Sequence, residues 1–201
     1  MSKLAIFDYG AGNIFSLKVA LEKIGAQVNV ISSFDGVNSF DGLLLPGVGN
    51  FDPAVKSISQ SKTKFEDFVK DKTPVLGICL GMEMFFEKSE EGTERGLAVM
   101  EGEVLILPNK FKIPHMGWNS LNIKKQNPLL DGVQDSAWVY FVHSYRVKPN
   151  DTDVIVAEAD YGIKVPAVIA KKNLFGTQFH PEKSGKVGST MLKNFLRECK
   201  K

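Results

Sequence analysis

Apolar and polar positions in the first half of the chain alternate between two patterns. Short, continuously apolar runs that end in glycine-rich turns are typical of strands buried on both faces of a sheet. Such runs occupy residues 3–8, 26–32, 42–47 and 74–79. Between them the apolar positions follow helical spacing, and the first helix is predicted to begin after Asn13 and to stop at Gly25. Further helices are predicted over about 52–70 and 80–88.

Strands that alternate with helices predict a mostly parallel sheet, because each parallel pair needs a crossover connection. In the second half, strand-like runs follow one another without helices between them, at residues 103–107, 120–123, 137–147, 153–159, 167–172 and 174–179. These runs predict hairpins or an antiparallel extension of the sheet, followed by a last helix from about Gly185 to Cys199. The predicted class is therefore α/β, a mostly parallel sheet flanked by helices with antiparallel additions in the C-terminal half.

Composition narrows the possible partners. A chain of 201 residues, 43% hydrophobic and without repeats or linkers, predicts a single domain over residues 1–201. A formal charge of only +2, with no basic stripe, argues against nucleic acid, and no apolar run is long enough to span a membrane. The two cysteines, Cys79 and Cys199, form neither a disulfide framework nor a metal-ligand pattern. We expect a cytoplasmic protein without a metal or cofactor.

The stretch PVLGICLGMEMFF, residues 74–86, carries the first candidate chemistry. Gly77 and Gly81 flank Cys79, as small residues flank a nucleophile held on a tight strand-to-helix turn. At such a turn the N-terminus of the following helix would favour the thiolate form of Cys79. By itself the pattern fits a reactive thiol and a small buried core residue equally well.

A thiol nucleophile needs a base and a group that orients the base. Of three histidines, His180 follows a strand-like run and precedes Pro181 and Glu182. On an extended segment residues i and i+2 face the same side, so Glu182 could hold the imidazole in one tautomer. A surface glutamate beside a histidine would give the same pattern. We interpret His115 and His143 as structural or interface residues.

Taken together, these two motifs resemble the paired signature of class I glutamine amidotransferases, with their Cys-His-Glu triad and flavodoxin-like fold. Over essentially the whole chain and in the same order, further stretches resemble the glutaminase subunits of imidazole glycerol phosphate synthase: DYGAGN, LLLPGVGNF, CLGM, IPHMGWN, YFVHSY and FHPEKSG. IPHMGWN discriminates best, because other amidotransferases that share the triad are not expected to contain it.

The resemblance implies a mechanism. Cys79 would attack the side-chain amide of glutamine, His180 would transfer protons, and Glu182 would orient His180. The oxyanion hole would use the backbone N–H of Leu80 and the segment that contains Gly47 and Val48, where flanking glycines would permit a peptide flip.

Substrate-binding roles are also implied by the resemblance, and they fall on Gly49, Glu83, Glu91, Ser144 and Tyr145. Glu91 would pair with the substrate ammonium, although its acidic surroundings are equally typical of a solvated face. Glu83 departs from the glutamine usual among relatives. A carboxylate accepts but does not donate hydrogen bonds, and its charge would raise the pKa of Cys79.

Free ammonia becomes ammonium and diffuses away, so a partner is implied. The resemblance predicts a heterodimer with a (β/α)8-barrel cyclase, which converts the ammonia and a ribulosyl nucleotide into imidazole glycerol phosphate and an aminoimidazole carboxamide nucleotide. The implied interface residues are Asn13, Trp118, Tyr140 and Lys183. Without the resemblance, core packing or solvation explains each of them.

Other functions remain open at this point. A paralogous subunit would feed ammonia to another barrel partner, for example in sugar amidation. A non-catalytic regulatory subunit would keep the fold, and the departure at Glu83 is the one hint of it. A free-standing cysteine hydrolase would need no partner at all.

Overall fold

The computed structural model describes residues 1–10, 13–59 and 61–200, and within these ranges no helix is long and apolar enough to cross a membrane. The α-helices are α1 (Ile14–Lys23), α2 (Phe51–Ser59), α3 (Lys62–Lys70), α4 (Leu80–Glu83) and α5 (Gly185–Glu198). The strands are β1 (Lys3–Phe7), β2 (Gln27–Ile31), β3 (Gly42–Leu45), β4 (Val75–Ile78), β5 (Lys88–Ser89), β6 (Gly102–Ile106), β7 (His115–Ser120), β8 (Asn122–Ile123), β9 (Trp138–His143), β10 (Tyr145–Pro149), β11 (Ile155–Asp160), β12 (Lys164–Lys171) and β13 (Leu174–Thr177).

A mixed sheet with the strand order β2-β1-β3-β4-β13-β12-β11-β8 forms the centre of the fold. The neighbours from β2 to β13 pair in parallel, and those from β13 to β8 pair antiparallel. Smaller sheets are made by β10, β6 and β5 and by β7 and β9. The predicted α/β class, with antiparallel additions in the second half, is confirmed.

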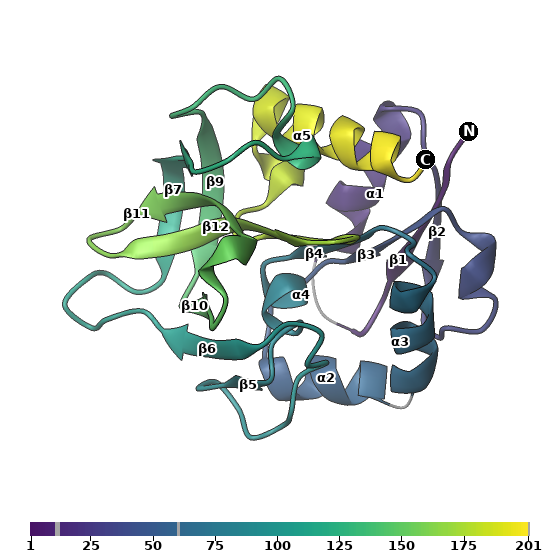
Figure 1. Ribbon diagram of the computed structural model, residues 1–201, viewed down its shortest axis with the longest axis horizontal. Coiled ribbons are helices and arrows are strands. Elements are labelled where there is room, and N and C mark those ends of the chain that lie inside the picture. Colours follow the sequence, from purple (N-terminus) through teal and green to yellow (C-terminus); the bar gives the residue numbers. More distant parts are fainter. Residues whose placement is uncertain (11–12, 60, 201) are drawn as a thin grey trace.

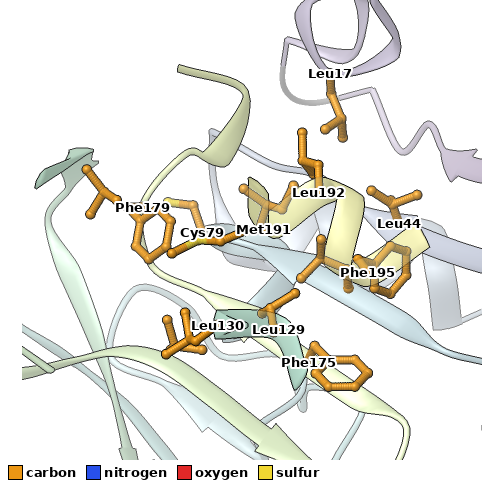
Figure 2. Close-up of a cluster of buried hydrophobic side chains, with 14 of the residues drawn as sticks. Leu17, Leu44, Cys79, Leu129, Leu130, Phe175, Phe179, Met191, Leu192 and Phe195 are labelled. Carbon is orange, nitrogen blue, oxygen red and sulfur yellow. The ribbon is translucent and has the colours of Figure 1, made fainter. Parts of the chain in front are cut away.

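Helices cover both faces of the parallel region: α1 and α5 lie on one side, α2 and α3 on the other (Figure 1). Alternate residues of β1 enter different cores, with Leu4 and Ile6 in the cluster under α1 and α5 and Ala5 and Phe7 in the cluster on the opposite face. Figure 2 shows the first cluster, in which Phe195 of α5 packs near Phe175 of β13. Burial on both faces explains the continuously apolar runs.

Two predicted helices have different boundaries in the structure. The helix expected over 80–88 is wrong beyond Glu83, because the carbonyls of Met84 and Phe85 accept hydrogen bonds from Leu97 and Val99 instead of continuing the helix. The region 52–70 forms two helices, α2 and α3, and residue 60 between them lies outside the described residues.

Two strand predictions also need correction. The run 137–147 divides at Ser144 into β9 and β10, which belong to different sheets. Strand β7 was not predicted, because its sequence HMGWNS has a glycine and no regular alternation of apolar residues. It forms by antiparallel pairing with β9, a contact between segments distant in the chain.

The carboxyl ends of β1, β3, β4 and β13 lie at one edge of the sheet, where open α/β folds place their ligands. The loops that follow these strands contain DYGAGN, PGVGN, Cys79 and His180. Residues 11 and 12 of the first loop are outside the described residues.

Candidate active site

Cys79 sits on a strained turn between β4 and α4. Its backbone angles are φ 53° and ψ −111°, a region that residues other than glycine rarely adopt. The N–H of Cys79 donates to the carbonyl of Thr177 at 2.7 Å, which ties the turn to the end of β13. The predicted tight strand-to-helix turn is confirmed, and strained backbone of this kind is concentrated at functional sites.

The two flanking glycines permit close backbone contact, as the sequence predicted. A Cβ atom on Gly81 would lie 2.6 Å from the carbonyl carbon of Leu45 in β3 and still closer to its oxygen. A Cβ atom on Gly77 would lie 2.7 Å from the carbonyl group of Gly81. The turn can therefore pack against β3 only without a side chain at Gly81, and it can fold back over β4 only without one at Gly77.

The thiol of Cys79 is not stabilised as a thiolate at rest, which corrects the prediction from the helix dipole. Helix α4 is only four residues long, and burial, followed by the charge of Glu83, raises the pKa of Cys79 well above its ordinary value. The backbone N–H of Leu80 and the side chain of Gln178 oppose this shift by hydrogen bonding. The Cys79 thiol, which points toward the carbonyl of Val142 at 3.9 Å, needs a base to become a nucleophile.

His180 and Glu182 form a buried pair, with 2.8 Å between Nδ1 and Oε1. The expectation of an extended segment is wrong, because a 3-10 turn, η4 (Pro181–Lys183), begins directly after His180. The carboxylate accepts from Nδ1–H and fixes the tautomer. Nε2 of His180 is buried without a hydrogen-bond partner in the part of the chain that the structure describes, so it is available to take a proton.

Strand pairing brings Cys79 and His180 to the same place. The parallel pairing of β4 with β13 sets Thr177 beside the turn, and His180 follows three residues later. The N–H of His180 donates to the carbonyl of Tyr140, while the sulfur of Cys79 faces the carbonyl of Val142 on the same strand, β9. The charge of Glu182 also raises the pKa of Cys79, so Glu182 lies near enough to act on the thiol, and the catalytic roles of the three residues stay a prediction.

A cavity of about 240 Å³ opens beside Cys79. Its lining includes residues predicted from the sequence, namely Val48, Gly49, Cys79, Leu80, Glu83, Glu91, Ser144 and Tyr145. Gly47 lies behind this wall, where a Cβ atom would fall 2.8 Å from Cβ of Leu80 and closer to the hydroxyl of Tyr9. Three lining residues were not predicted as pocket residues: Pro114, Val142 and His143.

Two carboxylates face this cavity. Glu83 is buried, its Oε1 accepts from Nε2 of Gln178 at 2.9 Å, and burial raises its pKa to about 7. Glu91 is half-buried, and its Oε2 accepts from the N–H of Phe51 at the start of α2. The solvated-face interpretation of Glu91 is therefore wrong, although its role stays a prediction.

We expect Glu83→Gln to raise stability in a pH-dependent way. The folded pKa of about 7 lies above the ordinary value of 4.5, so ionising Glu83 destabilises the folded state. That loss of stability develops as the pH rises from 4.5 to about 7, where it amounts to roughly 3 kcal/mol. Urea unfolding should show the variant more stable than the parent at about pH 8 and equally stable at about pH 4. The same difference at both pH values would contradict this explanation.

His115 and His143 form a neutral hydrogen-bonded pair. Nδ1 of His115 lies 2.9 Å from Nε2 of His143, whose Nδ1–H donates to the carbonyl of Tyr145 at 2.7 Å. Burial lowers the pKa of His115 to about 4 and that of His143 to about 3, so neither is charged at neutral pH. The pair links β7 and β9 to the cavity wall at Tyr145, consistent with a structural role.

The four predicted interface residues lie on neighbouring elements. Asn13 caps α1, its Oδ1 accepting from the N–H of Ser16 at 3.1 Å. Trp118 is 53% exposed, and its ring lies 6.0 Å from that of Tyr140 on the paired strand. Lys183 is exposed on η4, which packs against both α1 and β9. Contact with a partner stays a prediction.

Comparison with known proteins shows the family of this chain. A family model described as "Glutamine amidotransferase class-I" matches residues 5–199. Subunit HisH of imidazole glycerol phosphate synthase from Caldanaerobacter subterraneus subsp. tengcongensis is 46% identical, with 96% of each chain covered. The HisH 1 subunit from Methanococcus maripaludis is also 46% identical, over 96% of this chain and 98% of its own.

Among solved structures, PurLQS from Thermotoga maritima superposes with a TM-score of 0.79 at 17% identity, covering 98% of this chain and 99% of its own. A second structure, described as a glutamine amidotransferase, gives a TM-score of 0.78 at 16% identity, covering 98% of this chain and 99% of its own. These two similarities concern the fold. With the family model matched over residues 5–199, the chain belongs to the class I glutamine amidotransferase family.

Proposed function

We propose that this chain is the glutaminase subunit of an imidazole glycerol phosphate synthase in histidine biosynthesis. It would hydrolyse glutamine and pass the ammonia to a (β/α)8-barrel cyclase subunit. The observation that supports this most strongly is the thiol of Cys79 at the wall of a small cavity, together with the buried His180–Glu182 pair on the segment after β13, the strand that pairs with β4. Relatives that are 43–46% identical over nearly their full lengths are named as HisH subunits of that synthase.

In the first half of the proposed reaction, Nε2 of His180 takes the thiol proton of Cys79, and the sulfur attacks the amide carbon of glutamine. The backbone N–H groups of Leu80 and Val48, which line the cavity, donate to the resulting oxyanion. His180 then passes its proton to the leaving nitrogen, so that ammonia departs and a thioester remains. In the second half, His180 takes a proton from water, hydroxide attacks the thioester, and glutamate and the thiol are released.

The proposed position of glutamine follows from the charges of the cavity. Glu91 would pair with the substrate ammonium, and the backbone of Ser144 and Tyr145 would bind its carboxylate at the opposite wall. Glu83 lies near the sulfur, where its pKa of about 7 populates both protonation states at neutral pH. It can then accept from the substrate amide when ionised and donate to the amide carbonyl when protonated.

The partner forms part of the same proposal. The cyclase would dock where α1, η4, β7 and β9 meet, in contact with Asn13, Trp118, Tyr140 and Lys183, and a flip at Gly47 and Val48 would switch on the oxyanion hole. We also propose that the chain acts as one domain in the cytoplasm. The two unpaired cysteines support a reducing compartment.

Glu182→Gln should lower kcat by roughly 10²–10⁴-fold with little effect on KM. The amide can donate to Nδ1 of His180, which would leave Nε2 protonated and unable to accept the proton of Cys79. Steady-state glutamine hydrolysis by the full complex measures both constants. An unchanged kcat would remove Glu182 from the mechanism.

The proposed function is tested by measuring glutamate release from glutamine by the purified chain, alone and with the barrel cyclase and its nucleotide ligand. Cys79→Ala serves as the control. Slow release alone, strong stimulation in the complex and no release by the variant are the expected results. Equal release with and without the cyclase would favour another partner or a free-standing hydrolase, and no release under either condition would favour a regulatory subunit.

A further inference from the structure

Gln178 is a buried amide beside the thiol, and neither the sequence motifs nor the mechanism above gives it a role. It follows β13 and is fully buried. Its Nε2 lies 2.9 Å from Oε1 of Glu83 and 3.8 Å from the sulfur of Cys79. Its Oε1 is buried and has no hydrogen-bond partner among the residues that the structure describes.

The arrangement uses both donors of the amide. A side-chain amide nitrogen carries two N–H groups, and here one can serve Glu83 while the other faces Cys79. Rotating the amide by half a turn would bring its oxygen against the carboxylate and the sulfur, which an ionised Glu83 opposes. When it is ionised, Glu83 therefore fixes the orientation in which Gln178 presents an N–H to the sulfur.

We infer that Gln178 is a further catalytic residue, whose amide N–H stabilises the Cys79 thiolate, and that Glu83 is the positioning residue that orients it. The hydrogen bond from this N–H to the sulfur becomes stronger when the thiol loses its proton, because hydrogen bonds to an ionised acceptor are stronger than those to a neutral one. The inference rests on the proposed function for its meaning, since that thiolate is the one that attacks glutamine. The backbone N–H of Leu80 also opposes the rise in the pKa of Cys79.

Other titratable groups surround Cys79 and are kept constant in the test. They come from the loops after β1 and β5, from α4, β9 and β10, and from the segment after β13, and they are Tyr9, Glu83, Glu91, His143, Tyr145, His180 and Glu182. A change confined to Gln178 keeps all of these groups, but it also removes the hydrogen bond that lowers the pKa of Glu83. A more protonated Glu83 would lower the pKa of Cys79, so a rise in the midpoint is attributable to the lost amide donor.

The test measures alkylation of Cys79 by iodoacetamide as a function of pH in the full-length chain, with peptide mass spectrometry to separate Cys79 from Cys199. Gln178→Met keeps the approximate volume and removes the donor. We expect the pH midpoint to rise by about one unit, with a roughly tenfold slower reaction below the midpoint. Gln178→Asn, which keeps an amide but withdraws it from the sulfur, should shift the midpoint in the same direction and guards against a folding failure of the first variant.

Thr177→Val is the matched control. Thr177 is also buried and adjacent, but its hydroxyl donates to the carbonyl of Phe179 and not to the sulfur. The midpoint should stay unchanged in this variant. An unchanged midpoint in both Gln178 variants, with the parent chain active on glutamine, would overturn the inference while leaving the proposed function intact. A shifted midpoint in variants of a chain that releases no glutamate would support the inference about Gln178 and overturn the proposed function.

A double-mutant cycle tests the role of Glu83. In the Q178M background, E83Q only removes a negative charge near Cys79, so the thiol midpoint falls. In the parent chain E83Q has a second effect. An amide at position 83 donates as well as accepts, so it no longer holds Gln178 in one orientation. The midpoint of the Cys79 thiol should therefore fall less than in the Q178M background. Equal falls in both backgrounds would show that Glu83 does not act through Gln178.

Discussion

Replacing Cys79 by either alanine or glycine is expected to reduce glutamate release by roughly 10³-fold or more, because no other group in the cavity supplies the thioester. The two variants should differ in stability. At φ 53° and ψ −111°, alanine keeps the backbone strain of the native turn and glycine relieves it. Glycine loses more entropy on folding than alanine, and this loss offsets part of the relieved strain. We therefore expect the free energy of unfolding in urea to be about 1 kcal/mol higher for Cys79→Gly than for Cys79→Ala.

The control for this pair is Cys199→Ala. Cys199 is the other free thiol, buried at the end of α5, and it is not among the residues that line the cavity beside Cys79. Glutamate release should survive its removal. Loss of activity in Cys199→Ala, or a Cys79→Ala variant more stable than Cys79→Gly, would contradict the strained-nucleophile account.

Gly81→Ala should abolish the folded state or lower its stability by roughly 4 kcal/mol or more, among the largest effects of a single added methyl group. The new Cβ would lie 2.6 Å from the carbonyl carbon of Leu45, and neither backbone segment can move without breaking the pairing of β3 with β4. Expression level and thermal unfolding measure the effect.

Gly36→Ala is the matched glycine substitution. Gly36 has φ +74°, and a Cβ atom there would meet nothing within 4 Å. It should therefore cost only about 1 kcal/mol, from the left-handed backbone alone. Similar losses in the two variants would mean that close backbone approach does not explain Gly81.

Local sequence patterns predicted the parts of the site that depend on the chain nearby. Glycines around Cys79 indicated the turn because a tight backbone approach excludes side chains, and Asn13 indicated the start of α1 because its side chain caps the free N–H groups. The pairing of His180 with Glu182 was expected on an extended segment and occurs instead across η4.

Features that depend on distant segments were missed. Helix α4 stops at Glu83 because the backbone N–H groups of residues 97–100 donate to the carbonyls of residues 84–86, which would otherwise form the next helical turn. The thiol of Cys79 has a raised pKa because of burial and Glu83, neither of which the short motif reveals. Gln178 is part of the FGTQFHPE stretch, and its place beside the sulfur follows only from the pairing of β4 with β13.

The most direct test of the account labels the nucleophile itself. The full-length chain is treated with a glutamine analogue that carries a diazoketone in place of the amide, and the adduct is located by peptide mass spectrometry while residual glutamate release is followed in the presence of the cyclase. We expect one adduct, on Cys79, formed in proportion to the loss of glutamate release and blocked by excess glutamine. An adduct on Cys199 alone, or inactivation without modification of Cys79, would contradict it.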